Sequence, residues 1–276
     1  MFSALETGCI GVEADVWHFD GDLYVAHTHG SMQPGRTLQS MYIDPLLRLL
    51  REANSRDVAP SSSSSSYSSS TPQGLYAAHP SQTVVLLVDI KADAERAWPV
   101  LLQQLEPLRR EGWLSTLREN GQINTAPITV VVTGDILRIT DPGMGFDGPN
   151  YGMFLDAPLT GLEDGGGRGP YHSNNSYWAS VSLKKSIGLG WFGELGTSRL
   201  EKVKQQIQLA HSRGLQARYW GLPSWPMEVR NGVWEALLAE GLDILNVDDL
   251  KGFSEFWLQH ADVQDVWTSV KQRRPT

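Results

Sequence analysis

The chain has 276 residues, of which 20% are charged and 41% are apolar, a composition typical of a soluble globular protein with one large domain or two small ones. Its formal net charge of −8 disfavours a nucleic-acid partner, because the phosphates of a nucleic acid would be repelled. The single cysteine, Cys9, excludes an internal disulfide, and no apolar run approaches the roughly 20 residues that a membrane-spanning helix needs.

The first functional signal lies in the segment Ile10–His29, which follows a short helical segment at residues 1–8. The pattern of this segment predicts a strand, a tight Asp-Gly turn and a second strand. Alternate side chains of a strand share a face, so Glu13 and Asp15 lie side by side, and the returning strand brings His27 close to them. The opposite face is apolar, so we expect the strand to be covered on both sides. Buried carboxylates repel one another unless a cation or a proton lies between them, which indicates a metal site or an acid/base role. An ordinary solvent-exposed charged face is the alternative.

The rest of the chain alternates between apolar strand patterns and amphipathic helix patterns. Further strands are expected at residues 84–90, 128–132, 152–156, 177–182, 215–220 and 242–247. Helices are expected at residues 44–54, 94–111, 197–213, 227–240 and 250–260. A nearly pure serine run at 61–70 cannot bury apolar surface, so it predicts a disordered insertion at about 60–73.

This alternation predicts an α/β fold, and we interpret residues 1–276 as a single TIM (β/α)8-type barrel domain that lacks the first strand of the barrel. Seven main strands are expected where a barrel needs eight, and the chain begins within a helix, so we expect the missing strand to lie upstream of Met1. An open doubly wound sheet is the alternative. The barrel is favoured because polar residues recur at the expected carboxyl ends of strands, where barrel enzymes build their sites. These residues are Glu13, Asp15, Asp89, Lys91, Thr133, Asp156, Ser182, Trp220 and Asp248.

Two of these polar residues, Asp89 and Lys91, lie two positions apart at the end of one strand and therefore share a face. In a barrel this strand neighbours the one that carries Glu13 and Asp15, so three carboxylates and a lysine would meet at one mouth. An all-oxygen ligand set suits a hard divalent cation, Mg²⁺ or Ca²⁺. Lys91 would supply positive charge to an anionic substrate oxygen, and a simple salt bridge to Asp89 is the alternative.

The combination of a Glu-x-Asp pair, a histidine after a hairpin and an Asp-Ile-Lys strand end resembles the glycerophosphodiester phosphodiesterase and phospholipase C-like barrel superfamily. The similarity is closest to the fungal altered inheritance of mitochondria protein 6 family. It covers nearly the whole chain, including the segments GCIGVEADVW, DLYVAHT, RTLQSMYIDPLL, LLVDIKAD, FLDAPL, YWASVS, AHSRGLQARYWGLPSWP and LDILNVDDL.

The resemblance implies a divalent-cation-dependent cleavage of a phosphodiester, such as a glycerophospho- or lysophospholipid-like substrate. It implies that Glu13, Asp15 and Asp89 hold the metal, with Mg²⁺ expected and Ca²⁺ as the other choice. It also implies that His27 acts as a general acid or base and that Lys91 steadies the phosphate. The family name suggests a mitochondrial link, although no targeting segment is visible in the chain.

The chain departs from the family pattern at one essential point. The family places a first catalytic histidine on strand one in a His-Asn-Asp-like motif, and no such motif precedes Glu13 here. We therefore expect weak catalysis or none from this chain if it is the whole protein. Three functions stay open: a metal-dependent phosphodiesterase, a catalytically inactive barrel that binds a metal or an anion, and a metal-dependent barrel enzyme of another class, such as a sugar isomerase or aldolase.

Weaker signals come from tryptophans and from polar residues near other strand ends. The tryptophans that could line a pocket for an apolar leaving group are Trp17, Trp178, Trp220 and Trp225, with ordinary packing as the alternative. The polar residues are Asp156, Asn246, Asp248 and Asp249. Asp248 could help to orient ligands, with a cap of the helix after Asp249 as the alternative.

Overall fold

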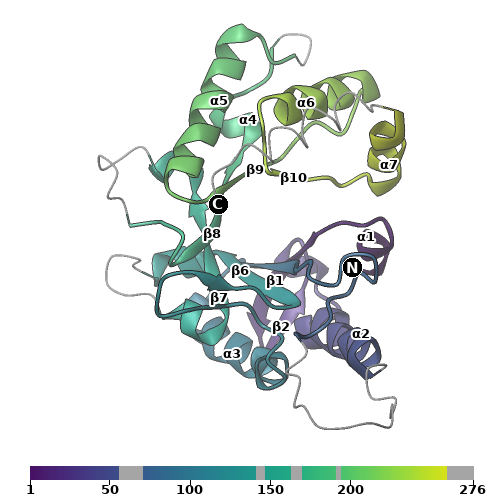
Figure 1. Ribbon diagram of the computed structural model, residues 1–276, viewed down its shortest axis with the longest axis vertical. Helices are drawn as coiled ribbons and strands as arrows, with labels where there is room; N and C mark the ends of the chain where they lie inside the picture. The colour runs from purple at the N-terminus through teal and green to yellow at the C-terminus, as the bar shows by residue number, and fades with distance from the viewer. Residues whose placement is uncertain (56–70, 141–146, 163–169, 191–193, 260–276) are drawn as a thin grey trace, which may run out of the picture. The chain divides into compact units, whose positions relative to one another are not determined.

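A computed structural model describes residues 1–55, 71–140, 147–162, 170–190 and 194–259 (Figure 1). The chain divides into two compact units, Met1–Leu155 and Asp156–Thr276, here named unit 1 and unit 2. Within the described ranges, no helix has the length and apolar character that crossing a bilayer requires.

Unit 1 contains a largely parallel sheet in the order β7-β6-β3-β1-β2. Its strands are β1 (Gly11–Phe19), β2 (Asp22–Val25), β3 (Val84–Ile90), β6 (Ile128–Gly134) and the first half of β7 (Met153–Pro158). The neighbours β1, β3, β6 and β7 are parallel, whereas β2 runs antiparallel to β1. The central strands β3 and β6 consist mainly of valine, leucine and isoleucine, and most of their side chains are buried, as expected of parallel strands covered on both faces.

The helices of unit 1 follow the sequence signals closely. They are α1 (Phe2–Glu6), α2 (Asp44–Ser55) and α3 (Ala94–Arg110), with a π-helical turn at Gln39–Ile43 before α2. Short 3-10 turns lie at His29–Ser31, Asp135–Arg138 and Gly148–Tyr151, and a small hairpin consists of β4 (Thr116–Leu117) and β5 (Ile123–Asn124). Apolar residues at helical spacing form the buried stripe of α3, namely Ala94, Ala97, Leu101, Leu105 and Leu108.

The β1–β2 hairpin confirms the turn predicted from the Asp-Gly pair. Asp20 and Gly21 both have positive φ angles, 49° and 76°, as a two-residue type I′ turn requires. This turn fixes the register, in which Trp17 lies opposite Tyr24. The returning strand therefore ends beside the carboxyl half of β1.

Within the described residues, unit 2 contains three parallel strands in the order β8-β9-β10, together with four helices. The strands are β8 (Ser176–Ser182), β9 (Gln216–Trp220) and β10 (Ile244–Leu245). The helices are α4 (Leu183–Ser186), α5 (Thr197–Ser212), α6 (Met227–Ala239) and α7 (Leu250–Gln259), and a 3-10 turn covers Leu159–Leu162.

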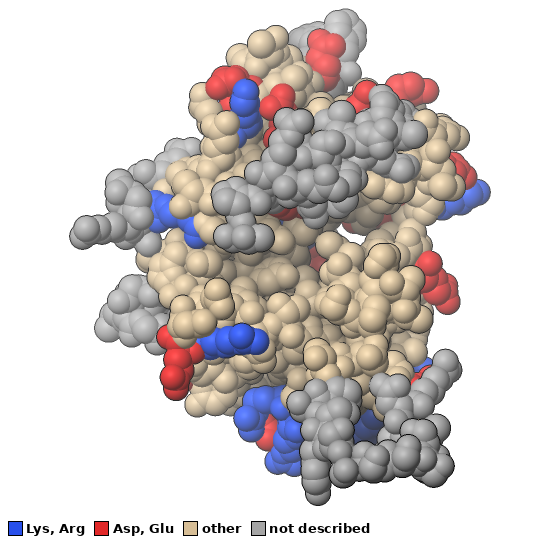
Figure 2. All heavy atoms as spheres, in the orientation of Figure 1, with Lys and Arg blue, Asp and Glu red and all other residues tan. Residues whose placement is uncertain are grey.

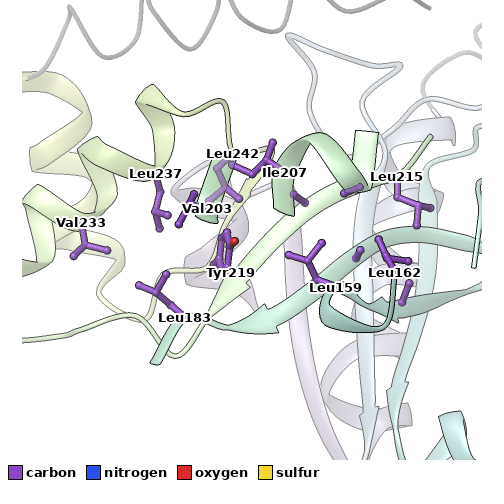
Figure 3. Packing of buried hydrophobic residues seen from close by; sticks show 14 residues of the cluster. Leu159, Leu162, Leu183, Val203, Ile207, Leu215, Tyr219, Val233, Leu237 and Leu242 are labelled. Carbon is purple, nitrogen blue, oxygen red and sulfur yellow. The ribbon is translucent and has the colours of Figure 1, made fainter. Parts of the chain in front are cut away.

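The core of unit 2 packs around the buried ring of Tyr219 on β9 (Figure 3). Ile207 of α5 and Leu237 of α6 belong to the same buried cluster, so both helices pack against the small sheet. A second cluster joins Trp234 of α6 to Phe256 of α7. Burial of these large apolar side chains is the main stabilising contribution in this unit.

The alternation of parallel strands and helices confirms the α/β class predicted from the sequence. Two details differ from expectation: the last strand is only Ile244–Leu245 rather than 242–247, and the β4–β5 hairpin was not anticipated. The predicted serine-rich insertion lies mostly outside the described residues, which omit 56–70. The single-domain interpretation of residues 1–276 stays a prediction.

Charged side chains occur in small groups on the face shown in Figure 2, where acidic residues lie beside several of the described Lys and Arg residues. On α3, Glu106 pairs with Arg109 at 2.6 Å and with Arg110 at 2.8 Å. Charges that are paired in this way produce only weak long-range fields.

Candidate functional site

The carboxyl ends of β1 and β3 bring three carboxylates together in unit 1. Asp15 lies directly opposite Asp89 in the parallel register, and partners in adjacent strands project from the same face. Glu13 lies two residues before Asp15 and therefore shares that face. Ligand oxygens of the three side chains lie within 4.8 Å of one another, close enough to share one cation. We name Glu13, Asp15 and Asp89 the carboxylate cluster.

The carboxylate cluster is more open to solvent than the sequence predicted. Val12, Ala14 and Val16 on the opposite face of β1 are buried, as expected, but Glu13 is exposed. The side chains of Asp15 and Asp89 are 22% and 18% exposed. The expectation that both faces of this strand are covered is therefore wrong at Glu13, and water there weakens the repulsion between the acids.

Lys91 forms ion pairs with two members of the carboxylate cluster. Its Nζ lies 3.0 Å from Oδ1 of Asp15 and 2.5 Å from Oδ2 of Asp89. Burial alone would lower the pKa of Lys91, but hydrogen bonds and charge from Asp89 and Asp15 outweigh it, so the pKa is raised above its ordinary value. The ammonium is thus charged at neutral pH. One lysine faces three carboxyl groups, so acidic side chains outnumber basic ones here.

The hairpin places His27 beside the carboxylate cluster. Backbone N–H of Ala26 donates to the carbonyl of Asp15 at 3.0 Å, and the indole of Trp17 donates to the carbonyl of Ala26 at 2.9 Å. These bonds fix the chain just before His27, whose Nδ1 lies 3.2 Å from Oδ2 of Asp15. The side chain of His27 is 89% exposed. The imidazole is therefore in contact with both the aspartate and solvent.

Tyr42 supports the carboxylate cluster from the π-helical turn, a contact that sequence reasoning missed. Its hydroxyl donates to the backbone carbonyl of Glu13 at 2.9 Å. Burial raises the pKa of Tyr42, and the charges of Asp15 and Glu13 raise it further. The hydroxyl therefore stays protonated and holds β1 in place at Glu13. No local sequence pattern around Tyr42 predicts a contact with a residue so distant in the sequence.

Three other described histidines, His18, His29 and His211, have partners outside the carboxylate cluster. Nδ1 of His18 lies 3.4 Å from Asp93, and Nε2 of His211 lies 2.8 Å from Asp243. The ring of His29 packs edge-on against Trp17, with centroids 5.5 Å apart.

Unit 2 contains a buried polar group that the sequence indicated only in part. Nη2 of Arg218 donates to Oδ1 of Asn246 at 2.6 Å, and its Nη1 lies 3.5 Å from Oγ of Ser180 and 3.9 Å from Asp156. The guanidinium also lies over the ring of Trp178, 5.6 Å from its centroid. Trp178 is buried, so its role here is packing. Asp156 and Asn246 were expected near strand ends, whereas Arg218 was missed, although an arginine inside an apolar strand is itself a signal of a buried charge partner.

Helix α7 is capped by Asp249 rather than by Asp248, the residue for which the sequence suggested a cap. Oδ1 of Asp249 accepts a hydrogen bond from the backbone N–H of Gly252 at 2.9 Å, and its other oxygen pairs with Arg230. Asp248 is exposed.

The amino-acid sequence of the chain is similar to those of one group of fungal proteins. A family model described as the AIM6-like phosphodiesterase domain matches residues 1–138. The altered inheritance of mitochondria protein 6 homolog of Arthroderma benhamiae is 34% identical over 250 residues, which cover 90% of this chain and 74% of that protein. Altered inheritance of mitochondria protein 6 of Eremothecium gossypii is 32% identical, with 93% of this chain and 66% of that protein covered. The protein of the same name in Saccharomyces cerevisiae (strain RM11-1a) is 30% identical, with 91% and 65% covered. No solved structure matches the chain.

Proposed function

Because the chain belongs to the AIM6-like phosphodiesterase family, we propose that it is a metal-dependent phosphoric diester hydrolase or lyase. The proposed substrate is a glycerophospho- or lysophospholipid-like diester, and the proposed architecture is a TIM (β/α)8-type barrel that lacks its first strand in this chain. The observation that carries the proposal is the convergence of Glu13, Asp15 and Asp89 beside Lys91 and His27. Membership of the family rests on sequence similarity, whereas the metal, the substrate and the roles of these residues are our proposal.

The donor set of the carboxylate cluster fits a divalent cation. Three carboxylates from adjacent strands offer oxygen ligands within 4.8 Å of one another, and hard cations such as Mg²⁺ and Ca²⁺ prefer oxygen. The excess of acidic side chains over the one lysine would also be offset by such an ion. A bound divalent ion supplies positive charge to the oxygens of a phosphodiester.

The protein's own side chains would bind the phosphate and move protons. The ammonium of Lys91 would contact a phosphate oxygen and stabilise the negative charge that accumulates there. When Nδ1 of His27 carries the hydrogen that faces Asp15, Nε2 is free to accept a proton from a nucleophile or, once protonated, to give one to a leaving alkoxide. The exposure of His27 lets a substrate reach it.

A second function is a metal- or anion-binding module without turnover, and the partners of two other histidines favour it. His18 and His211 pair with aspartates outside the carboxylate cluster. In this alternative the carboxylate cluster binds a cation but phosphodiester cleavage is absent.

Hydrolysis of bis-p-nitrophenyl phosphate tests the proposal. We expect activity in Mg²⁺, loss of activity in EDTA, and a decrease of more than about tenfold in Glu13→Ala, because even groups around a metal's ligands typically contribute this much. The matched control is Glu201→Ala on α5, an exposed glutamate in unit 2, which should behave as the wild type.

Calorimetric titration with Mg²⁺ separates the two functions. Binding that is weakened by Glu13→Ala, without hydrolysis in the wild type, would support the binding module. Equal hydrolysis by Glu13→Ala and the wild type would remove the carboxylate cluster from the mechanism.

A further inference from the structure

The segment between β9 and α6 exposes several large apolar side chains. Trp220, Trp225 and Met227 are 40%, 78% and 58% exposed, although they lie within eight consecutive residues, Trp220–Met227, which we name the tryptophan loop. Single exposed apolar residues are common on protein surfaces, but a group that includes two tryptophans is not. Such a group indicates a surface that binds a partner.

Two lysines lie at the same end of the neighbouring strand. Lys184 and Lys185 are exposed on α4, which begins directly after β8. Ser182, the last residue of β8, is the register partner of Trp220 on β9. The hydroxyl of Ser182 would lie 3.2 Å from a Cβ at Gly221, so the start of α4 lies beside the start of the tryptophan loop.

We propose that the tryptophan loop, together with Lys184 and Lys185, binds a phospholipid bilayer surface. Tryptophan suits the boundary between acyl chains and water, because its apolar rings enter the lipid while its N–H reaches a polar group. Lysines next to such anchors reach the phosphates of the headgroups. We choose a lipid surface as the partner because a bilayer offers, within one small area, acyl chains for the tryptophans and phosphates for the lysines.

The charge of the chain defines the kind of membrane. The net charge is −8, and the exposed Glu228 directly follows the tryptophan loop, so general attraction to an anionic membrane is weak. Binding therefore depends mainly on insertion of apolar side chains, and a zwitterionic bilayer suffices. This inference does not depend on the proposed phosphodiesterase activity, because binding to the membrane through the tryptophan loop requires no metal ion.

Sedimentation with phosphatidylcholine vesicles in EDTA tests the inference. We expect the wild type to bind. The ratio of bound to free protein should be about tenfold lower for Trp225→Ser, which corresponds to about 1.4 kcal/mol of binding free energy. The matched control is Leu258→Ser on α7, where the replaced side chain is 80% exposed but lies outside the tryptophan loop. This variant should bind as the wild type does. Replacing Lys184 and Lys185 with glutamine should produce a smaller loss.

Three outcomes would overturn the inference. They are failure of the wild type to bind vesicles, equal binding by Trp225→Ser, and an equal loss in Leu258→Ser. Sedimentation velocity without lipid addresses a protein partner: self-association that Trp225→Ser abolishes, without vesicle binding by the wild type, would assign the loop to a second copy of the chain. Circular dichroism checks that each variant is folded. Because the vesicle assay contains EDTA, a failure of the phosphodiesterase proposal would leave its result unchanged.

Discussion

Removal of the Lys91 ammonium should have opposite effects on metal binding and on stability. Lys91 lies between Asp15 and Asp89 and occupies carboxylate oxygens that a cation would also use. In Lys91→Met we therefore expect lower stability in EDTA, tighter binding of Mg²⁺, and slower hydrolysis of a phosphodiester. A lysine that served only to stabilise the fold would weaken or leave unchanged the binding of Mg²⁺.

The expected loss of stability follows from the two contacts of Lys91. A hydrogen bond to a charged group contributes about 1.5–3 kcal/mol when partly buried. Both contacts share one ammonium, on a side chain that is 24% exposed, so their contributions do not add fully. We expect a decrease in the free energy of unfolding of about 2–3 kcal/mol in EDTA. When Mg²⁺ is present at about 100 times its dissociation constant, its binding should raise the free energy of unfolding of Lys91→Met by about 2.7 kcal/mol.

Urea unfolding with and without Mg²⁺, combined with calorimetric titration, measures both quantities. The matched control is Lys251→Met on α7, because this lysine is 88% exposed and its partner Glu255 lies 3.8 Å away. A surface change of that kind should alter stability by less than about 0.5 kcal/mol. Unchanged stability and unchanged Mg²⁺ affinity in Lys91→Met would refute the reasoning, because the ammonium would then not compete with a metal.

Two further predictions concern residues around the strand ends of unit 1. Gly134 has a φ of 78°, and a Cβ there would overlap both Oδ1 of Asp89 and the backbone carbonyl of Ile90, so Gly134→Ala should lower stability and also weaken Mg²⁺ binding by about tenfold in calorimetry. Gly112→Ala is the control, since its φ is similar but no atom lies within 4 Å, and it should reduce stability by about 1–2 kcal/mol while leaving Mg²⁺ binding unchanged. Oδ2 of Asp135 accepts the backbone N–H of Ala94 at 3.0 Å at the start of α3, so Asp135→Asn should lower the free energy of unfolding by about 1 kcal/mol.

The contribution of Asp135 should depend on pH in a defined direction. The Arg138 side chain and then the backbone N–H of Ala94 lower the pKa of Asp135 below its ordinary value. The stabilisation is therefore present above the unfolded pKa of about 3.9 and is lost as the pH falls through the lower folded pKa. Wild type and Asp135→Asn should differ in urea unfolding at pH 6 and converge in strong acid. A difference that persisted unchanged below both pKa values would contradict the role of the charge.

The sequence predicted those parts of the fold that depend on local patterns. The apolar runs of β3 and β6 have the composition of buried parallel strands, and the Asp-Gly pair specifies a two-residue turn. Strand alternation placed Glu13 and Asp15 on one face, and the adjacency of successive strands placed Asp89 beside them. The two-residue period of a strand and the rule that successive strands are neighbours were sufficient for this, because neither requires knowledge of how individual side chains pack.

The features that were missed depend on contacts between distant residues or on what covers a surface. Tyr42 reaches the carbonyl of Glu13 across 29 positions, and Arg218 meets Asn246 across 28. Alternation says which side of β1 carries Glu13, but only the packing of the rest of the unit decides whether that side is buried. The exposure of Glu13 therefore had to come from the structure.

The exposure of Glu13 has a consequence for the strength of metal binding. A cation in the carboxylate cluster would have one ligand that is open to water and two that are shared with Lys91. Both features weaken binding, since water screens the charges and the ammonium must be displaced or shifted. We expect a dissociation constant for Mg²⁺ of about 10⁻⁴–10⁻³ M, comparable to that of the weakest Ca²⁺ sites built from oxygen ligands, and complete removal of the ion by brief dialysis against EDTA. Submicromolar affinity in calorimetry would contradict this expectation, because it would require a closed site in which Glu13 is shielded from water.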